Sequence, residues 1–387
     1  MFTLSIPSVI QVTCQKGLAP YLAREMRGLG FEVQPFRDMD PGVRTQGTLA
    51  DCMLLNLRLR CAQRVHYRLN RFGAMHPDMV YRAVNAMPWE EIFAGDGYFS
   101  VHSSVAHPTI RDNRFANLRV KDAVADRFVQ ATGRRPDSGP DEERGVCLFL
   151  YWRGKKAELS LDTSGAPLSR RGYRHRPMAA PMQETLAAAV IRAMDWDPDT
   201  HFVNPFCGSG TLAIEAALMA RHMAPGLLRD TFGFMHCREF DRDAWRALRD
   251  EARAEVLPRP SGRIVATDID PEAVDAARDN ARRAGVEQDI EFAVCDFRDT
   301  PVPDGPGAVC MNPEYGQRLG HEAELADTYK GIGDFLKQGC AGKRAGVFTG
   351  STALAKRVGL RAGAKVPFYN ARIPCMLLVY DLWEGSR

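Results

Sequence analysis

From residue 181 to residue 387, short apolar runs of strand length alternate with longer segments that have the apolar spacing of amphipathic helices. The runs expected to form strands are "HFVNPF" (201–206), "RIVATD" (263–268), "IEFAV" (290–294), "GAVCM" (307–311), "AGVFTG" (345–350) and "CMLLVYDLW" (375–383). Helices are expected between them, at 182–194, 211–223, 271–285 and 322–339. This alternation predicts an α/β domain with a doubly wound, mostly parallel sheet.

The first 163 residues have a different, less regular pattern that predicts a smaller α+β region. Strands are expected at "SVIQVTC" (8–14), "FEVQPF" (31–36) and "GYFSVHSSVA" (97–106), with a hairpin over 146–162 that turns at "RGKK". Helices are expected at 17–30, where Gly30 closes the segment, and at 77–87 and 114–133. Residues 50–69 read as a helix followed by a strand.

Charge is distributed unevenly along the chain. Residues 1–180 hold 26 Lys and Arg against 18 Asp and Glu, a net charge of +8, whereas the rest holds 25 against 30, a net charge of −5. Residues 164–180, "SGAPLSRRGYRHRPMAA", are expected to be a basic linker. Arg170, Arg171, Arg174 and Tyr173 are candidates for contact with a nucleic-acid backbone and an unstacked base. A solvated linker with no ligand is the alternative.

Other features argue against a membrane, secreted or metal-binding protein. No run of about 18 or more uncharged apolar residues is present, so no membrane span is expected. The first 20 residues lack a basic segment followed by a long apolar one, so no signal peptide is expected. The ten Cys residues form no C-x-x-C pair and no Cys/His cluster with zinc spacing, which favours reduced thiols in the cytoplasm and no metal.

The first motif that carries chemistry is "NPFCGSGTLAIEAA" (204–217), in which a strand leads through Gly208, Ser209 and Gly210 into a helix. Glycine permits a tight turn and close approach of a ligand to the backbone, and the helix N-terminus offers unpaired N–H groups. No Gly-Lys-Ser/Thr follows, and no third glycine completes G-x-G-x-x-G. The motif therefore predicts a small-molecule site that is neither a phosphate loop nor a dinucleotide fingerprint.

Two acidic residues follow the next two strands. Asp268 ends the strand "RIVATD", where a carboxylate can accept both hydroxyls of a ribose. Asp270 is instead expected to cap the next helix, with Pro271 in its first position and Gly285 after its end. Asp296 follows the strand "IEFAV" and is a candidate for the amino group of an adenine.

The last motif is "MNPEYGQRLG" (311–320). The oxygen of Asn312, together with backbone carbonyls, can accept both hydrogens of a planar amino group and hold its nitrogen toward an electrophilic methyl group. Pro313 stiffens the loop and orients its carbonyl, and Tyr315 can stack on the base that carries the amino group. An ordinary turn explains "NP" or "YG" separately, but not the ordered set of four motifs after successive strands.

With "LSLDTSGAPLSRRGYR" (159–174), "APMQETLAAAVI" (180–191) and "NPFCGSGTLAIEAALMARHMAPGL" (204–227), the chain resembles the bacterial THUMP-domain RNA guanine-N2 methyltransferases. In particular, it resembles the N-terminal half of the large-subunit rRNA methyltransferases of the RlmL type and their standalone homologues. The resemblance implies four parts: a ferredoxin-like subdomain (1–65), a THUMP RNA-binding domain (66–163), the basic linker (164–180) and a class I methyltransferase domain (181–387). The last strand of that domain is expected to be antiparallel.

The resemblance also implies roles for individual residues. The loop for the cofactor S-adenosylmethionine would comprise Asn204, Cys207, Gly208, Ser209, Gly210 and Thr211. Asp268 would bind its ribose and Asp296 its adenine, whereas Asn312, Pro313 and Tyr315 would hold the target base. Two residues depart from the family pattern, because Asn204 replaces an Asp and Glu314 replaces a second Pro. Glu314 is a candidate acceptor for the released proton, although water is the favoured acceptor.

The expected activity is methylation of N2 of a guanosine in RNA, with 23S rRNA as the first candidate. Three alternatives remain: a guanosine of tRNA, a glutamine of a protein, and an inactive RNA-binding or assembly factor. The basic N-terminal half disfavours the protein substrate, and the departures at Asn204 and Glu314 keep the inactive factor open. Neither the target nucleotide nor the oligomeric state follows from the sequence.

Overall fold

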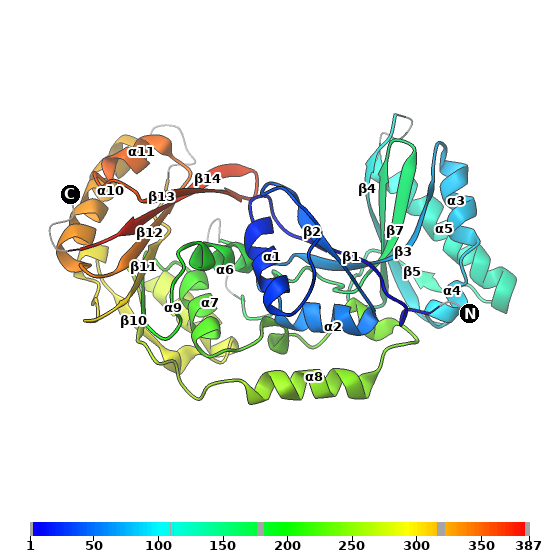
Figure 1. Ribbon diagram of the computed structural model, residues 1–387, viewed down its shortest axis with the longest axis horizontal. Coiled ribbons are helices and arrows are strands. Elements are labelled where there is room, and N and C mark those ends of the chain that lie inside the picture. The colour runs from blue at the N-terminus through cyan, green and yellow to red at the C-terminus, as the bar shows by residue number, and fades with distance from the viewer. Residues whose placement is uncertain (1–2, 109, 111, 176–181, 316–321, 384–387) are drawn as a thin grey trace.

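A computed structural model of the chain describes residues 3–108, 110, 112–175, 182–315 and 322–383. The end of the predicted linker and the residues after Tyr315 in the last motif lie outside the described residues. The molecule is elongated, and its two seven-stranded sheets lie next to each other along the long axis (Figure 1). We refer to residues 3–162 as the N-terminal region and to residues 182–383 as the C-terminal domain.

One continuous sheet runs through the whole N-terminal region. Its spatial order is β2 (Gly42–Gly47), β1 (Ser8–Thr13), β3 (Arg64–Gly73), β7 (Lys156–Asp162), β6 (Val146–Arg153), β4 (Tyr98–Ala106) and β5 (Asp137–Ser138). Strand β3 pairs with β1 through its first residues and with β7 over most of its length. The predicted boundary at residue 65 therefore falls inside a strand that both parts share.

Helices cover the N-terminal sheet in two groups. The first group comprises α1 (Ala19–Gly28) and α2 (Leu49–Arg58), and the second comprises α3 (Pro77–Asn85), α4 (Trp89–Ile92) and α5 (Asn113–Thr132). The expected strand over 31–36 is wrong, because these residues form an irregular segment and the strand is β2. Only isolated hydrogen bonds tie the segment to β2, among them Gln34 N–H to Arg44 O at 2.9 Å. Pro35 within this run has no N–H to donate to a strand ladder.

The C-terminal sheet has the predicted mostly parallel arrangement. Its order is β10 (Ile290–Val294), β9 (Ile264–Asp268), β8 (His201–Pro205), β11 (Gly307–Met311), β12 (Arg344–Thr349), β14 (Ile373–Asp381) and β13 (Ala364–Asn370). The first five strands are parallel, and the last strand of the chain, β14, is antiparallel to β12 as predicted. Strand β13 was not predicted. It contains Pro367 and lies at the edge of the sheet, where a missing N–H is tolerated.

The helices of the C-terminal domain cover both faces of its sheet, apart from one that packs beside the N-terminal region. They are α6 (Glu184–Ala193), α7 (Thr211–Ala220), α8 (Arg242–Ala254), α9 (Pro271–Arg283), α10 (Glu322–Gly339) and α11 (Thr352–Arg357), with short 3-10 turns η1 (Pro225–Leu228), η2 (Gly233–His236), η3 (Glu287–Asp289) and η4 (Phe297–Asp299). Residues of α6 and α7 share one core cluster with Phe202 and Phe348, whereas α10 packs in a second cluster with Val309 and Val347. None of the described helices is both long and apolar enough to cross a membrane. All ten cysteines are free, and nine are buried.

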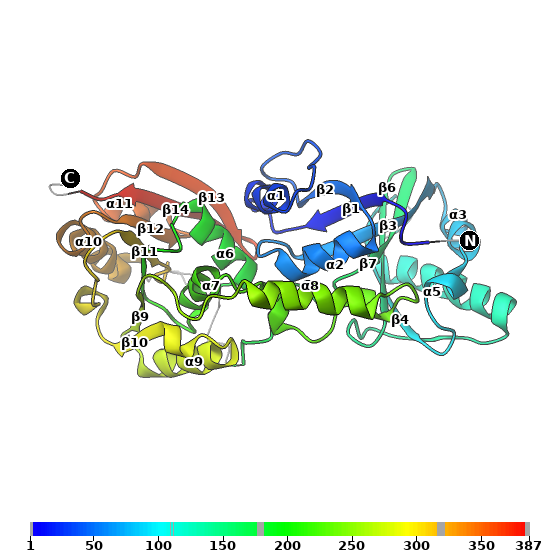
Figure 2. The same cartoon turned by 60° about the horizontal axis from the view of Figure 1, so that its bottom comes forward.

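The helix α8, which the sequence analysis did not identify, joins the two halves of the molecule. It leaves the C-terminal domain after α7 and runs beside α2 of the N-terminal region (Figures 1 and 2). Its Trp245 and Ala252 are buried, whereas most of its other side chains are charged. The insertion therefore packs a narrow apolar stripe against the neighbouring region and leaves the rest in solvent.

Candidate active site

The four motifs lie at one edge of the C-terminal sheet. Strands β8, β9, β10 and β11 are parallel, so their carboxyl ends meet at this edge, and each motif directly follows one of them. A hydrogen bond joins the first motif to β11, the strand that precedes the last motif, because Asn204 Nδ2 donates to Cys310 O at 2.8 Å. The geometry brings the predicted residues together, whereas their individual roles stay predictions.

The glycine turn is folded tightly and tied to the second motif. Gly208 and Gly210 have φ angles of 51° and 83°, which glycine adopts at little cost. Gly208 N–H donates to Asp268 Oδ2 at 2.9 Å. A Cβ on Gly210 would stand 2.9 Å from Ala277 Cβ, so the close packing of the turn on α9 requires glycine.

Phe206, which the sequence analysis did not single out, begins this turn in a strained conformation. Its φ of 57° lies in the left-handed region that aromatic residues rarely adopt. Its ring stacks on Phe297 with ring centroids 4.8 Å apart, so the first loop packs on the residue that follows Asp296. Strain of this kind is characteristic of functional sites and is retained because the surrounding contacts enforce it.

The two candidate carboxylates have different local partners. Asp268 is half-buried, and its oxygens accept the N–H groups of Gly208 at 2.9 Å and of Asp270 at 3.1 Å. Asp270 caps α9 through Glu272 N–H at 2.9 Å, as predicted. Asp296 accepts the Arg298 N–H and pairs with the Arg298 guanidinium at 3.0 Å, so an adenine amino group would compete with that ion pair.

Two buried acceptors at this edge have no hydrogen-bond partner among the described residues: Asn204 Oδ1 and Asn312 Oδ1. A buried polar atom without a partner costs about 1–3 kcal/mol. Ligands that bring N–H donors, such as an ammonium or an amino group, would remove that cost at both positions. The site therefore fits the predicted cofactor and an amino-bearing base. No group of three or more His, Cys, Asp or Glu among the described residues could hold a metal ion.

The substitution at Asn204 agrees with its surroundings. This side chain is fully buried, and its amide nitrogen donates to Cys310 O and, at 3.2 Å, to Pro205 O. A carboxylate in the same orientation would direct an oxygen at two carbonyl oxygens. The amide keeps one acceptor for a ligand and also joins β8 to β11.

Cys207 is placed in the turn as a neutral thiol. The side chain is buried, and burial, followed by the charge of Asp268, raises the pKa of the thiol well above its usual value. A thiol in this state is a poor nucleophile at neutral pH. The loop is therefore suited to binding through its backbone rather than to covalent catalysis.

Tyr315 is held by two segments that the sequence analysis did not connect with the site. Asn370, at the end of β13, donates from Nδ2 to Tyr315 Oη at 3.1 Å. On another side, Gly350 follows β12, and a Cβ at this glycine would stand 2.7 Å from Tyr315 Cδ2. The ring thus packs into the space left by the missing side chain at Gly350. It is held there by Asn370 of the hairpin that β13 forms with β14 (Ile373–Asp381).

The predicted RNA contacts of Arg171 and Tyr173 are wrong, because each side chain is only 1% exposed. Tyr173 Oη donates to Glu215 Oε1 at 3.3 Å, and Arg171 Nε lies 3.5 Å from the same oxygen. Burial acts to lower the pKa of Arg171, but Glu215 reverses the direction and keeps this guanidinium charged. The linker residues therefore neutralise a buried carboxylate of α7. Arg170 is exposed, and its RNA contact stays a prediction.

Arg174 supports the glycine turn instead of facing a ligand. Its Nη2 donates to Thr211 Oγ1 at 3.0 Å and to Met182 O at 2.6 Å, and its Nε lies 3.1 Å from Glu184. Asn280 of α9 supports the turn from another direction, since its Nδ2 donates to Ser209 O at 3.0 Å. The predicted RNA contact of Arg174 is therefore corrected to a supporting contact within the site.

We expect Arg174→Gln to weaken binding of S-adenosylmethionine by about tenfold, because a charged hydrogen bond is worth about 1.5–3 kcal/mol. Isothermal titration calorimetry measures this change. Arg170→Gln is the matched control, since Arg170 is an exposed linker arginine four residues away. Equal affinities for the two variants would contradict the supporting role.

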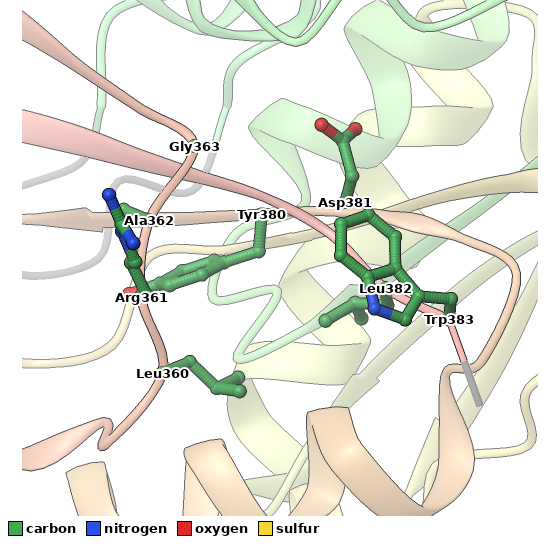
Figure 3. A pocket seen from close by; sticks show the side chains of 8 residues that line it. All are labelled: Leu360, Arg361, Ala362, Gly363, Tyr380, Asp381, Leu382 and Trp383. Carbon is green, nitrogen blue, oxygen red and sulfur yellow. The ribbon is translucent and has the colours of Figure 1, made fainter. Parts of the chain in front are cut away.

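A separate hollow lies away from the four motifs. It encloses about 350 Å³ and is lined by residues 360–363 and 380–383. Figure 3 shows Asp381 and Tyr380 pointing in different directions from β14, as neighbouring residues of a strand do. Asp381 pairs with Arg344, the first residue of β12, so the hollow is at the opposite edge of the sheet from the four motifs.

Comparisons with known families divide the chain into three parts. A profile described as "RMKL-like, methyltransferase domain" matches residues 171–378. A profile described as "RlmL ferredoxin-like domain" matches residues 10–66, and one described as "THUMP domain" matches residues 76–162.

Relatives cover nearly the whole chain. A protein of Syntrophotalea carbinolica named ribosomal RNA large subunit methyltransferase K/L is 40% identical over 98% of the chain and 54% of its own length. The chain thus spans about half the length of the curated relatives it matches. A putative methyltransferase solved in complex with SAH is 26% identical, with a TM-score of 0.88 and full coverage of both chains. A Listeria monocytogenes structure described as a predicted N6-adenine-specific DNA methylase is 29% identical, with a TM-score of 0.86 over 98% of this chain and 97% of its own.

Proposed function

The chain belongs to the RMKL-like methyltransferase family, and from this premise we propose that it methylates N2 of a guanosine in RNA, with 23S rRNA as the first candidate substrate. S-adenosylmethionine is the proposed methyl donor, in agreement with the SAH-bound relative. A cytoplasmic location belongs to the same proposal, because that is where bacterial rRNA is processed.

The observation that carries the proposal is Asn312 Oδ1, an acceptor that has no partner in the described part of the chain and lies directly after β11, beside the loop that follows β8. An exocyclic amino group offers hydrogens to such an acceptor, and holding it in place fixes the direction of the nitrogen lone pair. Orientation of this kind supplies much of the rate in a transfer between two bound molecules. A guanine paired in a helix cannot reach the site, so the base must be flipped out.

The remaining residues bind and orient the two substrates. Asp268 offers its remaining acceptor capacity to the ribose hydroxyls, and Asn204 Oδ1 accepts from the ammonium group of the donor. Bound S-adenosylmethionine would supply an electrophilic methyl group to N2 and would leave as SAH. The methylated nitrogen then releases its proton to water. Tyr315 stacks on the base, and Pro313 limits the motion of the loop.

The N-terminal region is suited to delivering RNA to this loop. It holds 22 Lys and Arg against 18 Asp and Glu, a net charge of +4, and contains the match to the THUMP domain. Helix α1 packs on β13, where Tyr21 stacks on Phe368 with centroids 5.8 Å apart. The same strand ends at Asn370, which holds Tyr315. The RNA-binding part therefore contacts the element that positions the base.

We expect Gly350→Ala to lower methyl transfer by about 10–100-fold, because the new methyl group would displace the Tyr315 ring and misalign the base. Cofactor affinity should stay within about twofold, and a thermal melt confirms that the variant is folded. Gly339→Ala is the control, since a Cβ there lies at an ordinary 3.8 Å from Phe335. If Gly350→Ala retained full transfer, the packing of Tyr315 would not matter for the reaction.

N6 of an adenine in nucleic acid is a second candidate, because Asn312 Oδ1 would accept from either amino group. The description of the Listeria structure as an adenine-specific methylase favours it. Both candidates are tested by incubating the purified chain and labelled S-adenosylmethionine with unmodified rRNA, tRNA and DNA, followed by nucleoside mass spectrometry. We expect N2-methylguanosine in rRNA. N2-methylguanosine in tRNA alone would identify the tRNA alternative, and N6-methyladenosine would overturn the base assignment. Cofactor binding without transfer to any pool would favour an RNA-binding factor.

A further inference from the structure

Glu314 lies on the same side of the target-base loop as Asn312. Burial alternates along this loop: Met311 and Pro313 are buried, Asn312 is half-buried and Glu314 is exposed. Residues two apart in an extended chain point to the same side, and the residue before a proline is held in an extended conformation. The loop therefore presents the side chains of Asn312 and Glu314 to the same side, with Asn312 the more buried of the two.

Both side chains offer oxygen acceptors that the rest of the described chain does not use. Among the described residues, none forms a hydrogen bond with Asn312 Oδ1, and none forms a hydrogen bond or an ion pair with the carboxylate of Glu314. Two neighbouring free acceptors match a ligand edge that presents two donors. The Glu314 carboxylate carries a full negative charge, so it attracts a hydrogen-bond donor of the ligand and repels an acceptor.

The edges of the two candidate purines differ at this point. Guanine presents its N1–H and N2 amino group next to each other, so all groups facing the loop are donors. Adenine presents an amino group beside N1, which is an acceptor. Adenine N1 would therefore face the Glu314 carboxylate, a second acceptor, and the two would repel each other. A flipped base is read through hydrogen bonds to this edge.

We propose that Glu314 accepts the N1–H of the target base and thereby selects guanine over adenine, while Asn312 accepts from N2. This inference rests on the proposed function and adds a specificity-determining residue to it. The residue that departs from the family's usual proline is then the one that reads the base, and the departure is not a sign of lost activity.

A role as proton acceptor makes a different prediction. Loss of a proton acceptor slows transfer to every base that carries an N2 amino group by the same factor. Loss of a group that reads N1–H slows transfer only to bases that have this hydrogen. The base 2,6-diaminopurine separates the two roles, because it keeps the N2 amino group and has an acceptor at N1.

The test uses synthetic RNAs that contain guanosine or 2,6-diaminopurine riboside at the methylated position, which is mapped by mass spectrometry of RNA fragments. We expect the wild-type chain to prefer guanosine in kcat/KM by about 10–100-fold, since a hydrogen bond to a charged group is worth about 1.5–3 kcal/mol. In Glu314→Ala this ratio should fall to within about threefold of one, mainly through loss of guanosine methylation, whereas the affinity for SAH stays unchanged. Asp304→Ala, which removes an exposed carboxylate before β11, should keep the wild-type ratio.

An unchanged ratio in Glu314→Ala would overturn the assignment of Glu314 while leaving the proposed function in place. If the ratio is unchanged because methylation of both RNAs falls by the same factor, Glu314 is instead the proton acceptor. If the wild-type chain methylates no guanosine in any RNA, the proposed function itself fails, and the assignment fails with it.

Discussion

Replacing Asn312 by Ala is expected to reduce methyl transfer by about 100–1000-fold, the loss typical of removing one preorganised polar group from an active site. The variant loses Asn312 Oδ1, which has no partner among the described residues and would hold the amino group. It keeps Asn204 and the glycine turn after β8, which would bind the methyl donor. Transfer is measured with labelled donor and unmodified rRNA. Calorimetry should give an SAH affinity within about twofold of wild type.

The variant Asn312→Asp tests whether the oxygen acceptor or the NH2 group of the amide is needed for transfer. It retains an oxygen at the same position and should keep more activity than Asn312→Ala. Full transfer by the Ala variant would show that the amino group is held by other groups. A large loss of SAH affinity in the same variant would place Asn312 in the donor site instead.

Replacing Asp268 by Ala is expected to weaken S-adenosylmethionine binding by about 100-fold, since two or more hydrogen bonds to a charged group are lost. The carboxylate holds the Gly208 N–H and the start of α9, so its removal also loosens the glycine turn. Calorimetry with SAH gives the affinity directly. At saturating donor, kcat should recover to within a few-fold of wild type, because Asp268 does not face the target base.

Asp270 is a matched control for this experiment. It lies two residues away and also accepts a backbone N–H, but as the cap of α9. Asp270→Ala should lower the free energy of unfolding by about 1 kcal/mol and change cofactor affinity little. Similar affinity losses in the two variants would mean that the effect comes from a disturbed helix start and not from a ribose contact.

Much of the C-terminal domain could be predicted because its signals are local. Strands β8 to β12 are apolar runs, each within two residues of its predicted bounds, and the motifs follow their carboxyl ends. Parallel pairing then brings those ends to one edge, whatever the rest of the chain does. Glycine at 208 and 210 and the Asp-Pro start of α9 are likewise local preferences that the structure retains.

Other elements carry weak or misleading signals. The segment 31–36 has the composition of a strand, but the adjacent β2 takes the pairing positions. Strand β13 alternates too little to be distinguished from a loop, and it forms because β14 offers it a partner along its whole length. Charge in the linker resembles a nucleic-acid signal because Glu215, the carboxylate it neutralises, lies within an otherwise apolar helix.

The sequence by itself determined the fold class and the order of the motifs, because periodicity, turn residues and helix caps act between neighbours. Tertiary structure decided which side chains remain available to a ligand. Asn204 bonds a carbonyl 106 residues away, Arg171 meets a carboxylate 44 residues away, and Asn370 holds a tyrosine 55 residues away. A polar side chain is available to a ligand only if no such intramolecular partner already uses it. Packing between distant segments decides which side chains have such a partner.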